Sequence, residues 1–177
     1  MNLKFGQPDH GVIQLAYVVE DIEASIRSFY ATMNVGPWQL RGPFTTTSAL
    51  YHAKPVALTL SIAHAFSGHT MLELIQQHDD TPSVYRDTIT ERGYGFHHWG
   101  VSCVDYDKKL DALKQQGRSP AFEDKTAIGT RVAYFDYRKE MGGFIEYIEM
   151  NAAAEARYTT MYARALMWDQ VELINKV

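Results

Sequence analysis

Hydrophobic and polar positions alternate in the first clearly patterned segment of the chain, residues 12–19. In an extended chain Ile13, Leu15 and Tyr17 fall on one side, while Gln14 falls on the other. The alternation predicts a β-strand with one apolar face. We expect that face to lie against a helix and Gln14 to lie on the opposite face.

The spacing of apolar residues then changes to that of a helix. Asp21 is a suitable N-cap, apolar residues recur at helical spacing over residues 22–33, and Gly36 with Pro37 ends the run. Residues 38–75 are rich in Thr, Val, Leu and Tyr and are interrupted by turn-forming pairs, which is typical of antiparallel strands. The predicted order is β-α-β-β-β.

The same pattern occurs a second time. Gly95–Asp105 matches Gly11–Asp21 at a constant offset of 84, with the glycine, the aspartate and the apolar positions in register. The strand predicted at residues 145–148 likewise resembles residues 72–75. An internal repeat of this kind predicts two modules of the same β-α-β-β-β order.

We therefore predict an α+β fold with two β-α-β-β-β modules that form a cup-shaped mixed sheet. The predicted boundaries are residues 10–77 for the first module, 78–94 for a connecting helix, 95–150 for the second module and 151–177 for a C-terminal helix.

The C-terminal helix is predicted from residues 151–170, which are rich in alanine. Met161, Tyr162, Leu166 and Trp168 are spaced so that they share one face of it. Such a face covers either a sheet edge of its own chain or a second subunit, and we predict a homodimer.

Composition narrows the class of partner. Hydrophobic residues make up 46% of the chain and charged residues 21%, the net charge is −4, and like charges form no runs. These features exclude a binder of nucleic acid or of an anionic membrane and leave a small-molecule substrate. Cys103 is the only cysteine, and neither a signal peptide nor a long apolar stretch is present, so we expect a cytoplasmic protein.

The candidate chemistry lies at equivalent positions of the two modules. Gln14 and His98 belong to the opening strands, and Glu73 and Glu146 belong to the closing strands. Each residue alone is compatible with an ordinary solvated strand face. As a set, they would hold one divalent ion such as Zn²⁺, Mn²⁺, Co²⁺, Ni²⁺ or Fe²⁺, whose charge the two carboxylates would balance.

Four other polar residues have simpler interpretations. His97 fits a packed or hydrogen-bonded histidine on the helix side of its strand, Glu149 a carboxylate at the rim, and Cys103 a thiol of the core. Arg131 fits either an anchor for an anionic substrate or a surface strand residue. Seven aromatic residues fall in or beside the strands, where each either packs under a helix or lines the cup: Tyr17, Trp38, Phe44, Tyr51, Trp99, Tyr134 and Phe144.

Four segments together resemble the vicinal oxygen chelate superfamily: Ile13–Asp21, Leu72–Gln76, Gly95–Val101 and Gly143–Ile148. That superfamily includes glyoxalase I, methylmalonyl-CoA epimerase, extradiol ring-cleaving dioxygenases and bleomycin-resistance proteins. The resemblance covers about residues 10–150. It implies a cup whose strands supply metal ligands, at the positions that match Gln14, Glu73, His98 and Glu146. This set of ligands is similar to that of eukaryotic-type glyoxalase I.

The resemblance implies a metal-dependent lyase or isomerase that moves a proton α to a carbonyl through a metal-bound enediolate, with Glu146 or Glu73 as the base. One alternative is an extradiol-type ring-cleaving dioxygenase. Such enzymes hold Fe²⁺ with two histidines and one carboxylate, and Gln14 at one of the histidine positions argues against this alternative. Another alternative is a metal-free small-molecule binding protein of the bleomycin-resistance kind.

Overall fold

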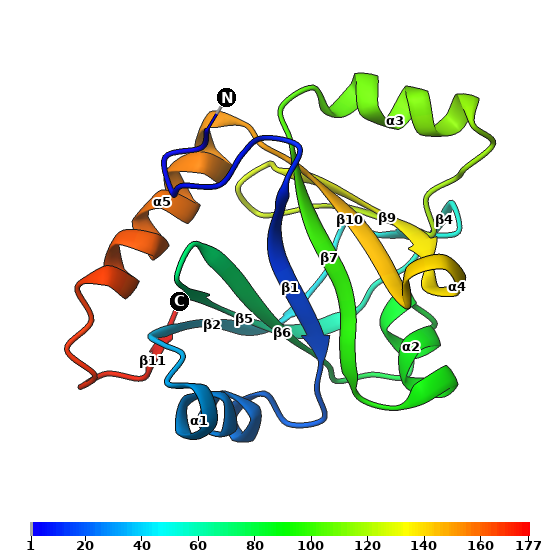
Figure 1. Ribbon diagram of the computed structural model, residues 1–177. Helices are drawn as coiled ribbons and strands as arrows, with labels where there is room; N and C mark the ends of the chain where they lie inside the picture. The colour runs from blue at the N-terminus through cyan, green and yellow to red at the C-terminus, as the bar shows by residue number, and fades with distance from the viewer. Residues whose placement is uncertain (1) are drawn as a thin grey trace.

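The structure is a computed structural model and describes residues 2–177. Figure 1 shows strands crossing at the centre of the molecule, with helices at its periphery. In chain order the elements are β1 (Val12–Val18), α1 (Ile22–Met33), β2 (Trp38–Thr45), β3 (Leu50–Tyr51), β4 (Lys54–Pro55), β5 (Thr59–Ser67), β6 (Thr70–Gln77), α2 (Val84–Arg92), β7 (Gly95–Cys103), α3 (Tyr106–Gln115), β8 (Phe122–Lys125), β9 (Arg131–Tyr137), α4 (Arg138–Met141), β10 (Gly143–Glu149), α5 (Ala152–Leu166) and β11 (Ile174–Lys176).

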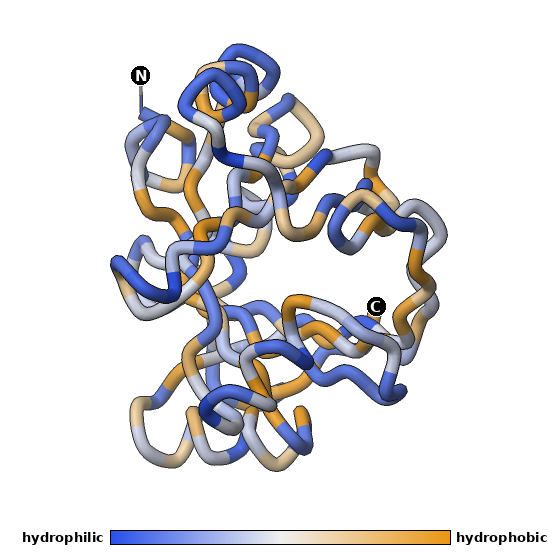
Figure 2. Tube along the Cα trace, turned by 90° about the vertical axis from the view of Figure 1, so that its right-hand side faces the viewer, coloured by the Kyte–Doolittle hydropathy of each residue, from blue (hydrophilic) through white to orange (hydrophobic). Residues whose placement is uncertain are grey.

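Within residues 2–177 the strands form one mixed sheet of eleven strands, in the order β11-β2-β5-β6-β1-β7-β10-β9-β8-β3-β4. The pairs β1/β6, β7/β10 and β2/β11 are parallel, and the other neighbouring strands are antiparallel. The sheet is curled, and in Figure 2 the trace bends around the middle of the molecule. The predicted α+β class is confirmed, and the module boundaries stay a prediction.

The repeat is visible in the register of the four central strands. Ala16 on β1 lies opposite His98 on β7 and beside Glu73 on β6. Its equivalent 84 residues later, Gly100, lies opposite Gln14 and beside Glu146. The two halves are therefore joined across β1 and β7 by a local two-fold relation.

β-Bulges interrupt β1 and β7 at equivalent positions. Between the pairs Val12/Val101 and Gln14/Gly100 the extra residue is Ile13, and the second register shift leaves His97 as the extra residue of β7. A bulge changes which face the following side chains occupy. Ile13 consequently packs in the core inside the curl. The prediction that Ile13 lies against the helix with its strand neighbours is wrong for this reason.

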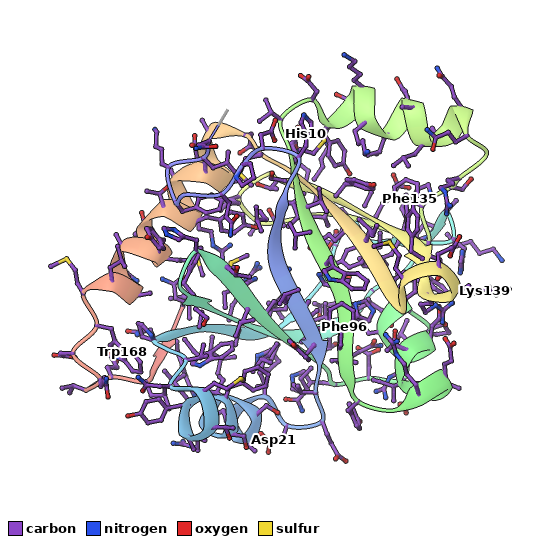
Figure 3. The ribbon with its side chains drawn as sticks, viewed as in Figure 1. His10, Asp21, Phe96, Phe135, Lys139 and Trp168 are labelled. Carbon is purple, nitrogen blue, oxygen red and sulfur yellow. The ribbon has the colours of Figure 1, made fainter. Side chains whose placement is uncertain are left out.

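Three apolar clusters hold the sheet and its helices together. One lies under α1, which begins at Asp21, whose side chain accepts a hydrogen bond of 2.9 Å from the N–H of Ala24. A second lies under α3 and contains Phe135, which Figure 3 labels below that helix. The third fills the inside of the curl and extends to α5, through Met161.

The C-terminal helix folds back on its own chain. Met161 is buried, Tyr162 packs against Phe66 and His69, and Trp168, labelled in Figure 3, packs edge-on against Tyr30 of α1. Of the four residues predicted to form the covering face, only Leu166 is largely exposed. The chain then continues into β11, a strand that the sequence did not predict. No helix in residues 2–177 has the length and apolar character needed to cross a membrane.

Candidate metal centre and its cavity

Four neighbouring strands of the sheet each supply one candidate ligand. In their order across the sheet, β6 carries Glu73, β1 carries Gln14, β7 carries His98 and β10 carries Glu146. Each of the four side chains is at most 6% exposed. The structure therefore brings together all four residues that the repeat singled out.

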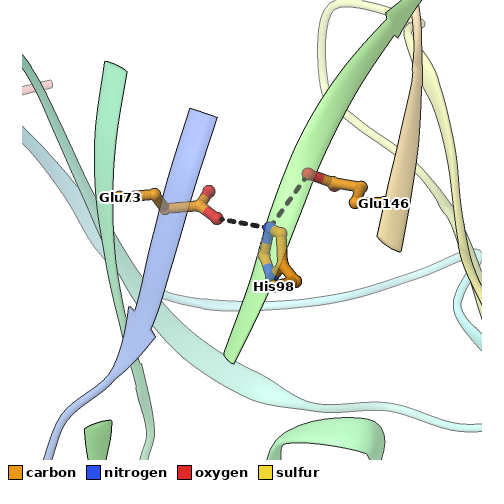
Figure 4. Close-up of side chains that lie close together, drawn as sticks. All are labelled: Glu73, His98 and Glu146. Atoms are coloured by element: carbon orange, nitrogen blue, oxygen red, sulfur yellow. Dashed lines mark hydrogen bonds and ion pairs between the residues drawn. The ribbon is translucent and has the colours of Figure 1, made fainter. Parts of the chain in front are cut away.

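The polar ends of these side chains meet at one point. Nε2 of His98 lies 3.1 Å from Oε2 of Glu146 and 3.4 Å from Oε2 of Glu73, as the dashed lines in Figure 4 show. The Gln14 amide nitrogen lies 2.8 Å from Oε2 of Glu73 and 3.2 Å from both Oε2 of Glu146 and Nε2 of His98. Side chains from four strands and from both halves of the chain thus converge on one point, where the Gln14 amide donates its N–H groups to the two carboxylates.

This donor set fits a divalent cation. Two buried carboxylates side by side need positive charge between them, and their oxygens and the imidazole nitrogen lie within 4.8 Å of one another. The Gln14 amide now donates its N–H groups into this space. Turned by half a rotation about its terminal bond, the same side chain presents an oxygen ligand. Carboxylate, imidazole and amide donors together suit the first-row divalent ions.

Without a cation, His98 supplies the positive charge. Burial opposes its protonation, but the carboxylates of Glu146 and Glu73 outweigh burial and raise the pKa of His98. The same pairing acts on Glu73, because hydrogen bonds from His64 and His98 outweigh burial and lower the pKa of its carboxyl group. The buried hydroxyl of Tyr134 stays protonated, since burial and the charge of Glu146 raise its pKa.

Two histidines beside the centre complete its surroundings. On β5, His64 lies opposite Glu73 and places Nε2 at 2.8 Å from Oε1 of that carboxylate. His97 places Nδ1 at 2.7 Å from Nδ1 of His98, and its Nε2 lies 3.1 Å from the Val84 carbonyl oxygen. Sequence reasoning missed His64, although its position between apolar residues at strand spacing marks it as facing the inside.

The two glutamates differ in how firmly they are held. Glu73 has partners on both oxygens, since Oε1 binds His64 and Oε2 binds Gln14. Glu146 uses only Oε2, toward Gln14 and His98, and its Oε1 has no hydrogen-bond partner among the described residues. This difference gives Glu146 one oxygen that is free to act on a ligand.

The centre opens into a cavity of about 500 Å³, which Gln14, Glu73 and Glu146 line. Aromatic side chains line it as well, among them Phe44 and Tyr134. Tyr17 instead packs edge-on against Phe29 of α1, which in turn contacts Trp38. A cavity of this size, with an apolar wall and a few convergent polar groups, suits a small-molecule ligand.

The comparison with protein families identifies the chain. A model described as the Glyoxalase/Bleomycin resistance protein/Dioxygenase superfamily matches residues 13–134. The chain belongs to this superfamily. The matched segment includes Gln14, Glu73 and His98 and ends before Glu146. The superfamily's description covers enzymes as well as bleomycin-resistance proteins.

Solved structures share the superfamily fold. A hypothetical protein from Bacillus halodurans C-125 matches with 17% identity and a TM-score of 0.58, over 80% of this chain and 94% of that one. Methylmalonyl-CoA epimerase from Mycobacterium tuberculosis matches with 15% identity and a TM-score of 0.57, over 82% and 91%. A methylmalonyl-CoA epimerase in complex with methylmalonyl-CoA and NH4+ matches with 15% identity and a TM-score of 0.55, over 82% and 98%. A search of curated proteins found no match.

The remaining candidates have structural partners. Arg131 pairs with Asp107 at 2.7 Å and with Glu149 at 2.7 Å, and its guanidinium lies over the Tyr106 ring. Cys103 is fully buried under α3. Arg131 and Glu149 therefore hold the outer side of the sheet together, and Arg131 is not placed to anchor a substrate in the cavity of this superfamily member.

Proposed function

We propose that this chain is a metal-dependent lyase or isomerase that promotes proton transfer at a carbon next to a carbonyl group of a small molecule. The observation that carries the proposal is the meeting of Gln14, Glu73, His98 and Glu146 at the floor of one cavity. A divalent ion bound there would balance both carboxylates and stabilise the negative charge that develops on substrate oxygens as the proton leaves.

Glu146 is the base in this proposal. Its Oε1 has no hydrogen-bond partner among residues 2–177, whereas both oxygens of Glu73 are engaged. A carboxylate with one free oxygen at the cavity wall can accept the α proton and return it to another position of the substrate. Glu73 is then the fixed partner, oriented by His64.

Metal content tests the first half of the proposal. Untagged protein should contain about one divalent ion per chain by elemental analysis, and His98→Ala should lose it together with activity. Protein that contains no ion and shows no thermal shift with Mn²⁺, Ni²⁺, Co²⁺ or Zn²⁺ would favour the metal-free binding protein instead.

The exchange of a substrate α proton with solvent deuterium tests the second half. The panel should contain hydroxy- and keto-carbonyl compounds and, because the structural matches include methylmalonyl-CoA epimerases, methylmalonyl-CoA. Glu146→Gln keeps a coordinating oxygen but loses the base, so exchange should fall by on the order of 10²-fold or more while metal content falls modestly. Full exchange in metal-loaded Glu146→Gln would move the base to Glu73. Oxygen uptake with catechols on Fe²⁺-loaded protein would favour the dioxygenase.

Two further expectations belong to this proposal. A homodimer now rests on the exposed apolar residues Leu166, Met167 and Val171 at the end of α5, and light scattering at micromolar concentration distinguishes it from a monomer. A cytoplasmic location stays a prediction from the single, buried Cys103.

A further inference from the structure

Three basic residues line the cavity that holds the candidate metal centre. They are Arg41 from β2, Lys125 from β8 and Arg157 from α5. The acidic residues of the same wall are Glu73 and Glu146, which belong to the metal centre, and Asp124. Asp124 is engaged by the Ser48 hydroxyl and by the backbone N–H of Lys125. Apart from the metal centre, the lining therefore carries three basic side chains and one acidic side chain, in a chain whose net charge is −4.

Most arginines of the chain already have partners. Six of the nine bind a carboxylate or a backbone carbonyl: Arg27, Arg86, Arg92, Arg118, Arg131 and Arg138. Within residues 2–177, no hydrogen bond or ion pair involves the guanidinium groups of Arg41, Arg157 and Arg164. Two of these three groups line the main cavity. A partly buried cation without a partner costs free energy that an anionic ligand would recover.

A bulge in β2 places Phe44 beside Arg41. Arg41 pairs with Ile62 and Phe44 pairs with Leu60, so β2 contains one more residue between these two pairs than β5 does. The extra residue places Arg41 and Phe44 on the same, cavity-facing side, where the guanidinium lies 4.0 Å over the Phe44 ring. Gly42 permits this, because its φ is +119° and a Cβ there would lie 2.7 Å from the Leu60 carbonyl oxygen. The edge of the guanidinium remains available to a ligand.

Arg157 comes from a different part of the chain. It lies on α5, outside residues 13–134 that the superfamily model matches, next to Tyr158, which also lines the cavity. The charges of Glu146 and Glu73 reach Tyr158, where together with burial they raise its pKa. The C-terminal helix thus brings a cation to the same cavity that holds the metal centre.

We propose that the cavity takes an organic anion, in which vicinal oxygens bind at the metal centre and a carboxylate or phosphate group binds to Arg41 and Arg157. This inference rests on the proposed function for the oxygen-bearing end of the ligand and is independent of it for the anionic end. The aromatic and aliphatic wall between the two ends contacts an apolar linker. Planar guanidinium groups suit both oxyanions because they donate two parallel N–H groups.

Matched chelators test the two ends separately. Adipic and suberic acid monohydroxamates each carry two vicinal oxygens for the ion and a free carboxylate, and their methyl esters lack only the charge. Binding to Mn²⁺-loaded protein is measured by calorimetry. One free acid should bind about tenfold or more tightly than its ester, since a charge-assisted hydrogen bond discriminates by that factor. A phosphonate-tailed hydroxamate of the same length shows which oxyanion is preferred.

The variants locate the anion. Arg157→Met and Arg41→Met should each remove most of the preference for the acid, and Arg157→Lys should retain part of it. Arg164→Met is the matched control: Arg164 lies on the same helix, likewise has no ion pair, and lines a different, small pocket. The preference of Arg164→Met for the free acid over its ester should equal that of the unsubstituted protein. Circular dichroism checks that each variant is folded. If one of the two arginine variants does not fold, the other variant alone is enough to test the anion site.

The outcomes separate this inference from the proposed function. Equal binding of acid and ester, or a preference that survives both Arg157→Met and Arg41→Met, overturns the anion site. Esters that bind no better with Mn²⁺ than without it overturn the metal centre instead. In that case, the affinities of the metal-free protein for octanoate and for methyl octanoate are compared to test the anion site alone. Equal affinities for the two compounds would reject the anion site.

Discussion

At the scale of single residues, the two nitrogens of His98 have different tasks. Nε2 faces Glu73 and Glu146, and it must be unprotonated to bind a cation. The ring proton then lies on Nδ1, which is 2.7 Å from Nδ1 of His97. His97 must accept that hydrogen bond, so its own proton lies on Nε2 and is donated to the Val84 carbonyl. The low pKa of His97, which burial and the charge of His98 cause, is consistent with a neutral acceptor.

Substitutions of His97 should separate these two hydrogen bonds. Asn at position 97 keeps an acceptor toward His98, whereas Gln keeps a donor toward Val84. We expect His97→Gln to weaken Mn²⁺ binding by about 10–100-fold, because the partner that orients a metal-binding histidine is lost, and His97→Asn to weaken it less. Calorimetry with Mn²⁺ measures the affinities of the two variants and of the unsubstituted protein. Urea unfolding of the metal-free proteins shows whether a loss of affinity comes from a loss of stability. The reverse order would mean that His97 only packs.

The difference between Arg131 and Arg41 shows what residue type alone leaves open. Both follow strand patterns, but Arg131 pairs with Asp107 and Glu149, while Arg41 lines the cavity. The local pattern of the sequence shows neither the carboxylate partners nor the cavity. The sequence left Arg131 open as a substrate anchor or a surface strand residue, and its ion pairs agree with the second interpretation.

At the scale of elements, small residues between the ligand-bearing strands leave space for the centre. Ala16 and Gly100 occupy equivalent positions on β1 and β7, and each is paired with two ligands. A Cβ at Gly100 would lie 2.7 Å from Cβ of Gln14 and 3.0 Å from Cδ1 of Ile148. Gly100 thus sets the distance at which β1 holds the Gln14 amide.

Gly100→Ala should displace Gln14 and lower the affinity for Mn²⁺, with a loss of stability of about 1–3 kcal/mol from overpacking. Gly36→Ala is the control, because a Cβ there would overlap the ring of Trp168, which packs on Tyr30 of α1 far from the centre's ligands. That variant should lose stability but keep its metal affinity. Calorimetry and urea unfolding give the two quantities. If Gly100→Ala binds Mn²⁺ with unchanged affinity, Gln14 is not a ligand of the ion.

The order of elements was predictable because alternation and the internal repeat are local signals. Asp21 and the periodicity after it predicted α1, and the offset of 84 residues placed Gln14 and His98 in equivalent strands. The bulges at Ile13 and His97 were not predictable, since they depend on how two strands pair. The same holds for β11, three residues whose hydrogen bonds exist only beside β2.

At the scale of the whole molecule, the candidate centre joins the two halves of the sheet. Glu73 and Gln14 come from the first half, and His98 and Glu146 come from the second. The repeat placed these residues at equivalent positions of the two modules, and their common strand face predicted that the two sets would meet in a shared concavity. The C-terminal helix lies outside the repeat, so the sequence did not predict that it brings Arg157 to the same cavity.

A cation at this position should stabilise the whole fold, because it binds the native arrangement of four strands and not the unfolded chain. At a free Mn²⁺ concentration of 100 times its dissociation constant, linkage gives about 2.7 kcal/mol, which raises the melting temperature by about 5–10 °C in a domain of this size. Differential scanning fluorimetry of chelator-treated protein, with and without Mn²⁺, measures the shift. His98→Ala should abolish it, and His10→Ala should retain it, since the exposed side chain of His10 pairs with Asp9 and, within residues 2–177, with no other side chain. An equal shift in both variants would place the cation elsewhere on the molecule and leave the two carboxylates to be balanced by His98 alone.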